Sequence, residues 1–152
     1  MSTDNIDILC NTAIETLERF AFLLGDPPNR DEAGLPPLPP RLWLVTLTFT
    51  GARTGTVVLA TAPDLARQIA ANLYSLDLTA ITDDQAIDAL KELLNVTTGD
   101  YLHALEGNEP IFDLTPPALA ALDRAEFERH WADRPHIALN VEGQPLWLGF
   151  GS

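Results

Sequence analysis

The feature that most constrains the fold is an order of elements that occurs twice along the chain. Each copy has a long segment of helical periodicity, then prolines, then a pair of apolar strands. The helical segments span about Asp4 to Leu24 and Thr82 to Leu105, with apolar residues at the spacing of one helix face. This order predicts an α/β (more narrowly α+β) fold of two diverged half-repeats, each with a long helix and antiparallel strands. The long helices are expected to pack on the sheet.

The first half shows clear boundaries between its predicted elements. Gly25 and two prolines stop the first helix, and Pro27–Pro40 holds six of the twelve prolines, which predicts a stiff irregular connection. Alternating apolar residues predict strands over Leu42–Phe49 and Thr56–Thr61, joined by a hairpin turn. A further helix is expected over Pro63–Tyr74.

The second half opens with a capping box, in which Thr82 is the N-cap and Gln85 follows three residues later. The long helix is expected to end before Gly107. The remaining predicted elements are a short strand at Ile111–Leu114 that Pro116 and Pro117 prevent from continuing, a short helix at Ala125–Trp131, and a terminal hairpin of His136–Val141 and Pro145–Phe150.

Length and composition indicate one domain over residues 1–152, because 46% hydrophobic residues suffice for a substantial core. The lone cysteine, Cys10, falls within the apolar pattern of the first helix and is expected to be buried. No signal peptide is visible, and no apolar run approaches the roughly 20 residues of a membrane span. We therefore expect a cytoplasmic protein that does not enter a membrane.

The chain is strongly acidic, with 22 acidic residues, 9 basic residues and a net charge of −13. Such a surface repels phosphate backbones, so nucleic-acid binding is disfavoured. The charge excludes a class of partner without naming one, since acidity also simply keeps a protein in solution.

One face of the long second helix carries the residues of greatest chemical interest. At about 100° per residue, Asp88, Glu92, Asn95 and Gly99 project together from the side opposite the apolar stripe. Polar residues opposite an apolar stripe are typical of any surface helix. Asn95, however, is a weak helix former, and Gly99 costs about 1 kcal/mol relative to alanine. A glycine permits close approach of another backbone, so the pair indicates an interface centred on Asn95.

At these residues the sequence resembles the CheC/CheX family of chemotaxis phosphatases, in its CheX-like branch. The family signature is Asp or Ser, three residues, Glu, two residues, Asn, twenty-one residues and Pro. Asp88, Glu92, Asn95 and Pro117 match it at every spacing. The resemblance implies a CheC-like fold and an enzyme, a hydrolase of two-component signalling that removes phosphate from the aspartyl phosphate of a CheY-like response-regulator receiver domain.

The resemblance also assigns roles to the motif. Asn95 is expected to position the attacking water, as glutamine does in GTPases, and Glu92 to dock against the lysine of the receiver. Asp88 and Gly99 are expected to support docking, and Pro117 to be structural. We expect no metal or cofactor in this chain, because the receiver supplies its own Mg²⁺.

The sequence of the first helix indicates how many active sites each chain has. Aligning the halves places Asn11, Glu15 and Glu18 opposite Asp88, Glu92 and Asn95, with Pro40 opposite Pro117. A carboxylate at Glu18 would repel phosphate, so the first half is predicted to be inactive. By analogy with the CheX branch, the protein is expected to be a homodimer with one site per chain, joined through an edge strand.

Two other functions stay open on the sequence alone. A non-catalytic module for receiver binding or dimerisation would keep the same helix surface, and a structural protein would match the motif by accident. His103 projects near the acidic face and permits a carboxylate–histidine metal site, but a solvated histidine explains it as well. His130 and His136 show no ligand or triad spacing.

Overall fold

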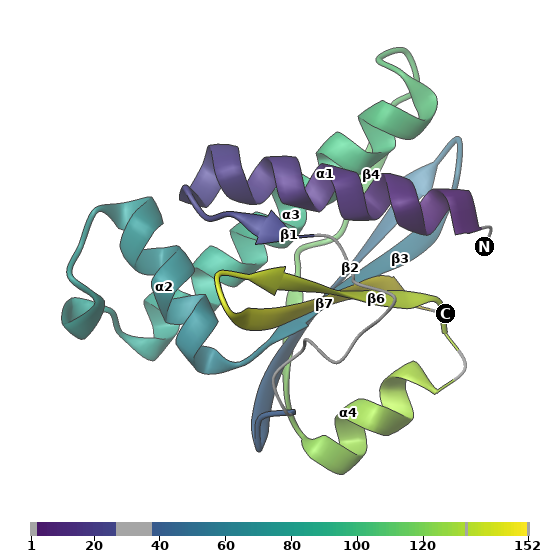
Figure 1. Ribbon diagram of the computed structural model, residues 1–152. Helices are drawn as coiled ribbons and strands as arrows, with labels where there is room; N and C mark the ends of the chain where they lie inside the picture. Colours follow the sequence, from purple (N-terminus) through teal and green to yellow (C-terminus); the bar gives the residue numbers. More distant parts are fainter. Residues whose placement is uncertain (1–2, 27–37, 133, 152) are drawn as a thin grey trace.

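The computed structural model describes residues 3–26, 38–132 and 134–151 (Figure 1). In chain order the elements are α1 (Thr3–Ala21), β1 (Gly25–Asp26), β2 (Arg41–Gly51), β3 (Gly55–Thr61), α2 (Pro63–Tyr74), the 3₁₀ helix η1 (Leu78–Ala80), α3 (Asp83–Glu106), β4 (Phe112–Leu114), β5 (Ala118–Asp123), α4 (Arg124–Trp131), β6 (His136–Val141) and β7 (Gln144–Gly151). The predicted mixture of helices and antiparallel strands is confirmed. Most of the predicted connection Pro27–Pro40 lies outside the described residues.

The seven strands form one antiparallel sheet in the order β1-β6-β7-β3-β2-β4, and β5 also pairs with β2. The central neighbours are β3 and β7, where Leu59 lies opposite Leu148. The order is symmetric about this pair, because hairpin β2–β3 has hairpin β6–β7 as its counterpart. Short strand β1 extends the hairpin of the second half, and β4 extends that of the first. The topology thus confirms two diverged half-repeats, and their strands are interleaved.

Helices α1, α2 and α3 cover one face of the sheet, and α4 covers the other (Figure 1). Strand β2 serves both layers because successive side chains point to opposite faces. Val45 and Leu47 join the core beneath the three helices, whereas Leu42 and Leu44 pack with Phe127 of α4. A strand buried on both faces is apolar almost throughout, which is the pattern seen at 42–49.

Helix α3 lies against both α1 and α2, and each long helix packs on the hairpin of the other half. Contacts of α3 with the sheet include β2 and β3, whereas those of α1 include β6 and β7. Leu90 and Leu94 of α3 are fully buried, and each such leucine contributes about 1.5–3 kcal/mol to folding. The expected burial of Cys10 in α1 is confirmed.

Two sequence-based expectations need correction. Helix α1 ends at Ala21 rather than near Leu24, because Phe22 adopts a left-handed φ of 55° that breaks the helical path; Leu24 is exposed. After Pro117 the chain returns to the sheet as β5, which the sequence did not predict.

None of the described helices combines the length and apolar character needed to cross a membrane.

Candidate functional site

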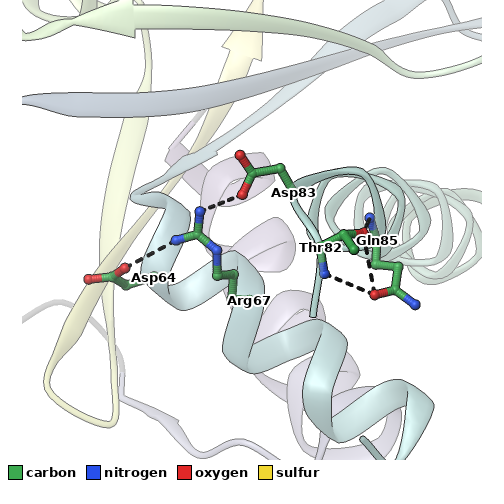
Figure 2. A network of polar contacts seen from close by, with 5 residues as sticks. All are labelled: Asp64, Arg67, Thr82, Asp83 and Gln85. Carbon is green, nitrogen blue, oxygen red and sulfur yellow. Dashed lines mark hydrogen bonds and ion pairs between the residues drawn. The ribbon is translucent and has the colours of Figure 1, made fainter. Parts of the chain in front are cut away.

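The N-terminus of α3 is fixed by a capping box and by an ion pair to α2. The hydroxyl of Thr82 accepts from the Gln85 backbone N–H at 3.1 Å, and the Gln85 side chain accepts from the Thr82 N–H at 2.9 Å. Arg67 of α2 pairs with Asp83 at the first position of α3 and reaches Asp64 at 3.4 Å (Figure 2). The predicted capping box is confirmed, and the start of α3 is anchored to a neighbouring helix.

Two further ion pairs hold the middle and the end of α3. Arg19 of α1 donates to Asp100 at 2.6 Å, and Arg53 of the β2–β3 turn lies 3.0 Å from Glu106 in the last turn. The helix ends at Gly107, whose φ of 82° is a left-handed value that glycine adopts without strain. The helix is therefore tied to its neighbours at its start, in its second half and at its end.

The inward face of α3 is apolar or small and the opposite face is open. Asp88, Glu92, Asn95 and Gly99 are all exposed, on the side away from the core. The structure thus brings these four predicted site residues together on one surface. The residues that face inward are Ala86, Ala89, Leu90, Leu93, Leu94, Thr97, Thr98, Tyr101 and Leu102.

No contact among the described residues requires a glycine at position 99. A Cβ atom built there meets no heavy atom within 4 Å, apart from the helix's own neighbouring backbone. Gly99 also borders a groove of about 230 Å³, whose lining includes Leu102, Phe112 and Leu114. Alanine would suit the helix better by about 1 kcal/mol, and the packing of the described residues gives no reason for glycine here.

Tyr74, the last residue of α2, belongs to the surroundings of this face and was not singled out from the sequence. Burial and the neighbouring carboxylates of Asp88 and Glu92 raise the pKa of its hydroxyl. The hydroxyl of Tyr74 is thus within electrostatic reach of the acidic half of the α3 face. The only sequence signal was an aromatic residue at a helix end followed by Leu76 and Leu78.

The equivalent surface of α1 differs in two positions that matter. Asn11, Glu15 and Glu18 are exposed there, so the aligned positions form a comparable face. Glu18 takes the place of the carboxamide, and Phe22, which aligns with Gly99 in the sequence, lies just beyond the end of α1 with 73% of its surface exposed. A carboxylate thus stands where α3 has a neutral amide, and the helix has already ended at the position aligned with Gly99.

The two aligned prolines occupy matching places. Pro117 directly precedes β5 and Pro40 directly precedes β2, and β5 and β2 pair with each other. Proline is suited to the first residue of a strand, where no ladder hydrogen bond is needed. Along the chain, the rest of α3 and strand β4 separate Pro117 from Asn95. This position is compatible with a structural role for Pro117.

The histidines do not gather with acidic residues. Within residues 3–26, 38–132 and 134–151 no three His, Cys, Asp or Glu side chains are grouped so that they could hold a metal ion. His103 is exposed on α3. His136 stacks on Trp131 with ring centroids 4.9 Å apart, and the ring of His130 meets the same indole edge-on.

Solved structures share this fold across nearly their whole length. CheX from Vibrio vulnificus is 15% identical, with a TM-score of 0.73 over 98% of this chain and 99% of that one. The CheX–CheY–BeF3–Mg²⁺ complex from Borrelia burgdorferi contains a chain 14% identical, with a TM-score of 0.65 over 99% and 98%. The FliM middle domain from Vibrio alginolyticus is 11% identical, with a TM-score of 0.55 over 96% and 89%. At these identities the likeness concerns the fold.

Comparison with protein-family models identifies the family of the chain as well as its fold. No curated protein sequence matches the chain. The model of the family described as chemotaxis phosphatase CheX matches residues 44–135, which include the whole of α3 and Pro117. The match covers more than half of the 152 residues, and the chain therefore belongs to the CheX family of chemotaxis phosphatases.

Proposed function

We propose that this protein is a phosphatase that hydrolyses the aspartyl phosphate of a CheY-like receiver domain. The observation that carries the proposal is the exposure of Glu92 and Asn95, one turn apart, on the outward face of a helix fixed at both ends. The family match and the fold shared with the CheX of a solved CheX–CheY complex support a receiver as partner.

Asn95 is the proposed catalytic residue. Its carboxamide oxygen accepts a hydrogen bond from a water molecule, and its N–H donates to a phosphoryl oxygen, which places the water in line with the scissile bond. The water oxygen then bonds to phosphorus as the bond to the aspartyl oxygen breaks. Inorganic phosphate leaves as H2PO4−, which carries the oxygen and both hydrogens of the water and can release one proton to solvent, and the receiver regains its carboxylate. A neutral side chain suits this position because a carboxylate would repel the phosphoryl oxygens.

Glu92 is the proposed docking residue, with the active-site lysine of the receiver as its partner. A charge-assisted hydrogen bond of this kind contributes about 1.5–3 kcal/mol. It also explains how a chain with a net charge of −13 approaches a phosphorylated site, because the group it contacts there is a cation.

The other motif residues complete the proposal. Asp88 and Gly99 border Glu92 and Asn95 on the same surface and support docking, and Pro117 sets the start of β5. We propose that the chain needs no cofactor of its own and that the Mg²⁺ of the reaction belongs to the receiver. We also propose that both proteins act in the cytoplasm.

The test is the decay of a CheY-type receiver phosphorylated with acetyl phosphate, with and without this protein. Wild type is expected to accelerate decay, and Asn95→Ala to lower kcat about 100-fold, as loss of a transition-state donor does. Glu18→Ala, at the aligned position of α1, is the matched control and is expected to leave kcat unchanged. Acceleration that survives the loss of Asn95 contradicts the mechanism.

The second candidate function is a non-catalytic receiver-binding or dimerisation module. The fold shared with the FliM middle domain shows that this architecture is not confined to proteins named as phosphatases. The same assay separates the candidates, because such a module binds the receiver without changing its rate of decay.

We further propose a homodimer with one site per chain. Strand β5 pairs with β2 along one side and forms the outer strand at this end of the described sheet, where Ala118, Ala120 and Ala121 are exposed. An exposed edge of this kind favours pairing with another strand. Sedimentation equilibrium tests this proposal, and a monomeric mass at micromolar concentration would contradict it.

A further inference from the structure

The last residue of α2 and the chain that leads from it to α3 display large apolar side chains at three alternate positions. Tyr74, Leu76 and Leu78 are 40%, 43% and 47% exposed, and every residue from 74 to 80 is exposed. We refer to these three residues as the apolar segment. Single exposed apolar residues are common, but three large ones this close together are a feature of interaction surfaces.

The apolar segment adjoins the face of α3 that carries Glu92. Helix α2 packs against α3, and the ion pair between Arg67 and Asp83 joins the two helices at the start of α3. Tyr74 lies close enough to Asp88 and Glu92 for both carboxylates to act on its hydroxyl. The packing of α2 on α3, together with this electrostatic effect, puts Tyr74 within reach of a protein docked over Glu92.

The backbone holds the apolar segment in a defined shape. Helix α2 is capped by Ser75 in the left-handed conformation, and the N–H of Leu76 donates to the Ala71 carbonyl at 3.0 Å. The 3₁₀ helix follows, in which the N–H of Ala80 donates to the Asp77 carbonyl at 2.9 Å. A preformed surface binds with a smaller loss of conformational entropy than a flexible one.

The size of a stable interface requires more than the four motif residues. A specific complex buries about 800 Å² on each partner, spread over roughly 20–30 residues. The neighbours of α3 in the helical layer are α1 and α2. Helix α1 offers exposed Glu15 and Glu18, whereas α2 leads into the apolar segment. Interface centres are poor in acidic residues and rich in tyrosine, which favours the side of α2.

We propose that Tyr74, Leu76 and Leu78 form the apolar part of the docking surface for the receiver domain, which would cover them with apolar side chains beside its phosphorylated aspartate. This inference rests on the proposed function, since it assigns a partner to the same face. The division of labour is specific: Asn95 acts on the reacting water, Glu92 pairs with a cation, and the apolar segment contributes affinity without acting on the reaction.

The test compares the double variant Leu76→Asp/Leu78→Asp with Ile111→Asp, using the same phosphorylated receiver. Ile111 is 84% exposed and lies beyond the far end of α3, so it is a matched control for placing a charge on an exposed apolar site. The double variant is expected to raise KM about tenfold or more, with kcat at saturating receiver close to that of wild type. Tyr74→Ala is expected to change KM in the same direction. Ile111→Asp is expected to change neither constant.

The outcomes separate the two proposals. If wild type neither binds nor dephosphorylates a receiver, the proposed function fails and takes this inference with it. If wild type is active and the double variant keeps a wild-type KM, only this inference is overturned. Circular dichroism and thermal unfolding check that the variants are folded. Should the double variant be unfolded, Tyr74→Ala alone decides, and an unchanged KM for it overturns the inference.

Discussion

Arg19 of α1 donates a hydrogen bond of 2.6 Å to Asp100 of α3, the residue that follows Gly99. The hydroxyl of Thr16 lies 3.2 Å from the same carboxylate oxygen. Helix α1 has no carboxamide at the aligned position, but it thereby helps to hold α3, the helix that carries Asn95. Groups supplied by α1 therefore add to the packing that orients α3, the helix from which Asn95 projects.

The Arg19–Asp100 pair is expected to contribute modestly to stability. Its side chains are 63% and 41% exposed, so a coupling free energy of about 0.5 kcal/mol is expected from a double-mutant cycle with Arg19→Ala and Asp100→Ala. Urea unfolding measures this coupling, and 1 M NaCl should largely remove it. A coupling that is absent at low salt, or insensitive to salt, contradicts an exposed ion pair.

Two substitutions of Gly99 are expected to change different properties: one raises the stability of the fold, and the other weakens binding of the receiver. Gly99→Ala is expected to raise the free energy of unfolding by about 0.5–1 kcal/mol, because the helix gains a better former and the new methyl meets no neighbour. Gly99→Trp is expected to leave the fold intact but raise KM for the receiver, since the ring stands in the docking surface. A wild-type KM for Gly99→Trp would show that no partner approaches this position.

Glu92 is expected to affect binding more than chemistry. Glu92→Gln removes the charge while keeping the shape, so KM should rise about tenfold or more through loss of a charge-assisted bond, with a smaller change in kcat. Glu15→Gln, at the aligned position of α1, is the control. Equal increases in KM for the two substitutions would indicate a general electrostatic attraction to the receiver instead of a specific partner for Glu92.

The buried thiol of Cys10 is expected to make the folded state less stable as the pH becomes alkaline. Burial and the nearby carboxylate of Asp7 raise the pKa of the thiol from 9.0 to about 11. The unfolded chain therefore loses this proton first as the pH rises. The contribution of Cys10, on the order of 2 kcal/mol, is present below pH 9 and lost between about pH 9 and 11.

Urea unfolding of wild type and Cys10→Ala across this range provides the measurement. The variant should lose stability less steeply as the pH rises, because it has no thiol at this position to ionise. Parallel curves for the two proteins would show that the thiol is not buried as described.

Much of the fold could be predicted because local signals agreed with the final packing. Pro63 at the start of α2 and the box of Thr82 and Gln85 mark helix starts through chemistry that acts within a few residues. The outward face of α3 followed from periodicity alone, since the core decides which side is apolar. The roles of Asn95 and Glu92 came from a family resemblance and stay predictions.

The missed elements depend on long-range contacts. Strand β5 has the sequence Ala-Leu-Ala-Ala-Leu-Asp, without one β-branched or aromatic residue, and exists because β2 offers it an edge. The ion pair of Arg19 with Asp100 joins residues 81 positions apart. The nearness of Tyr74 to Glu92 follows from the packing of α2 on α3, which sequence spacing does not encode.

The interleaving of the two halves limits how such a chain can have evolved. If the halves descend from a duplicated ancestor, the copy in α1 was free to exchange its carboxamide for Glu18 and its open position for Phe22. It was not free to disappear, because α3 packs on β2 and β3, and β4 pairs with β2. The half without the carboxamide thus persists as structural support for the helix that carries the motif, and a deletion that spared all of the motif would still remove strands on which α3 packs.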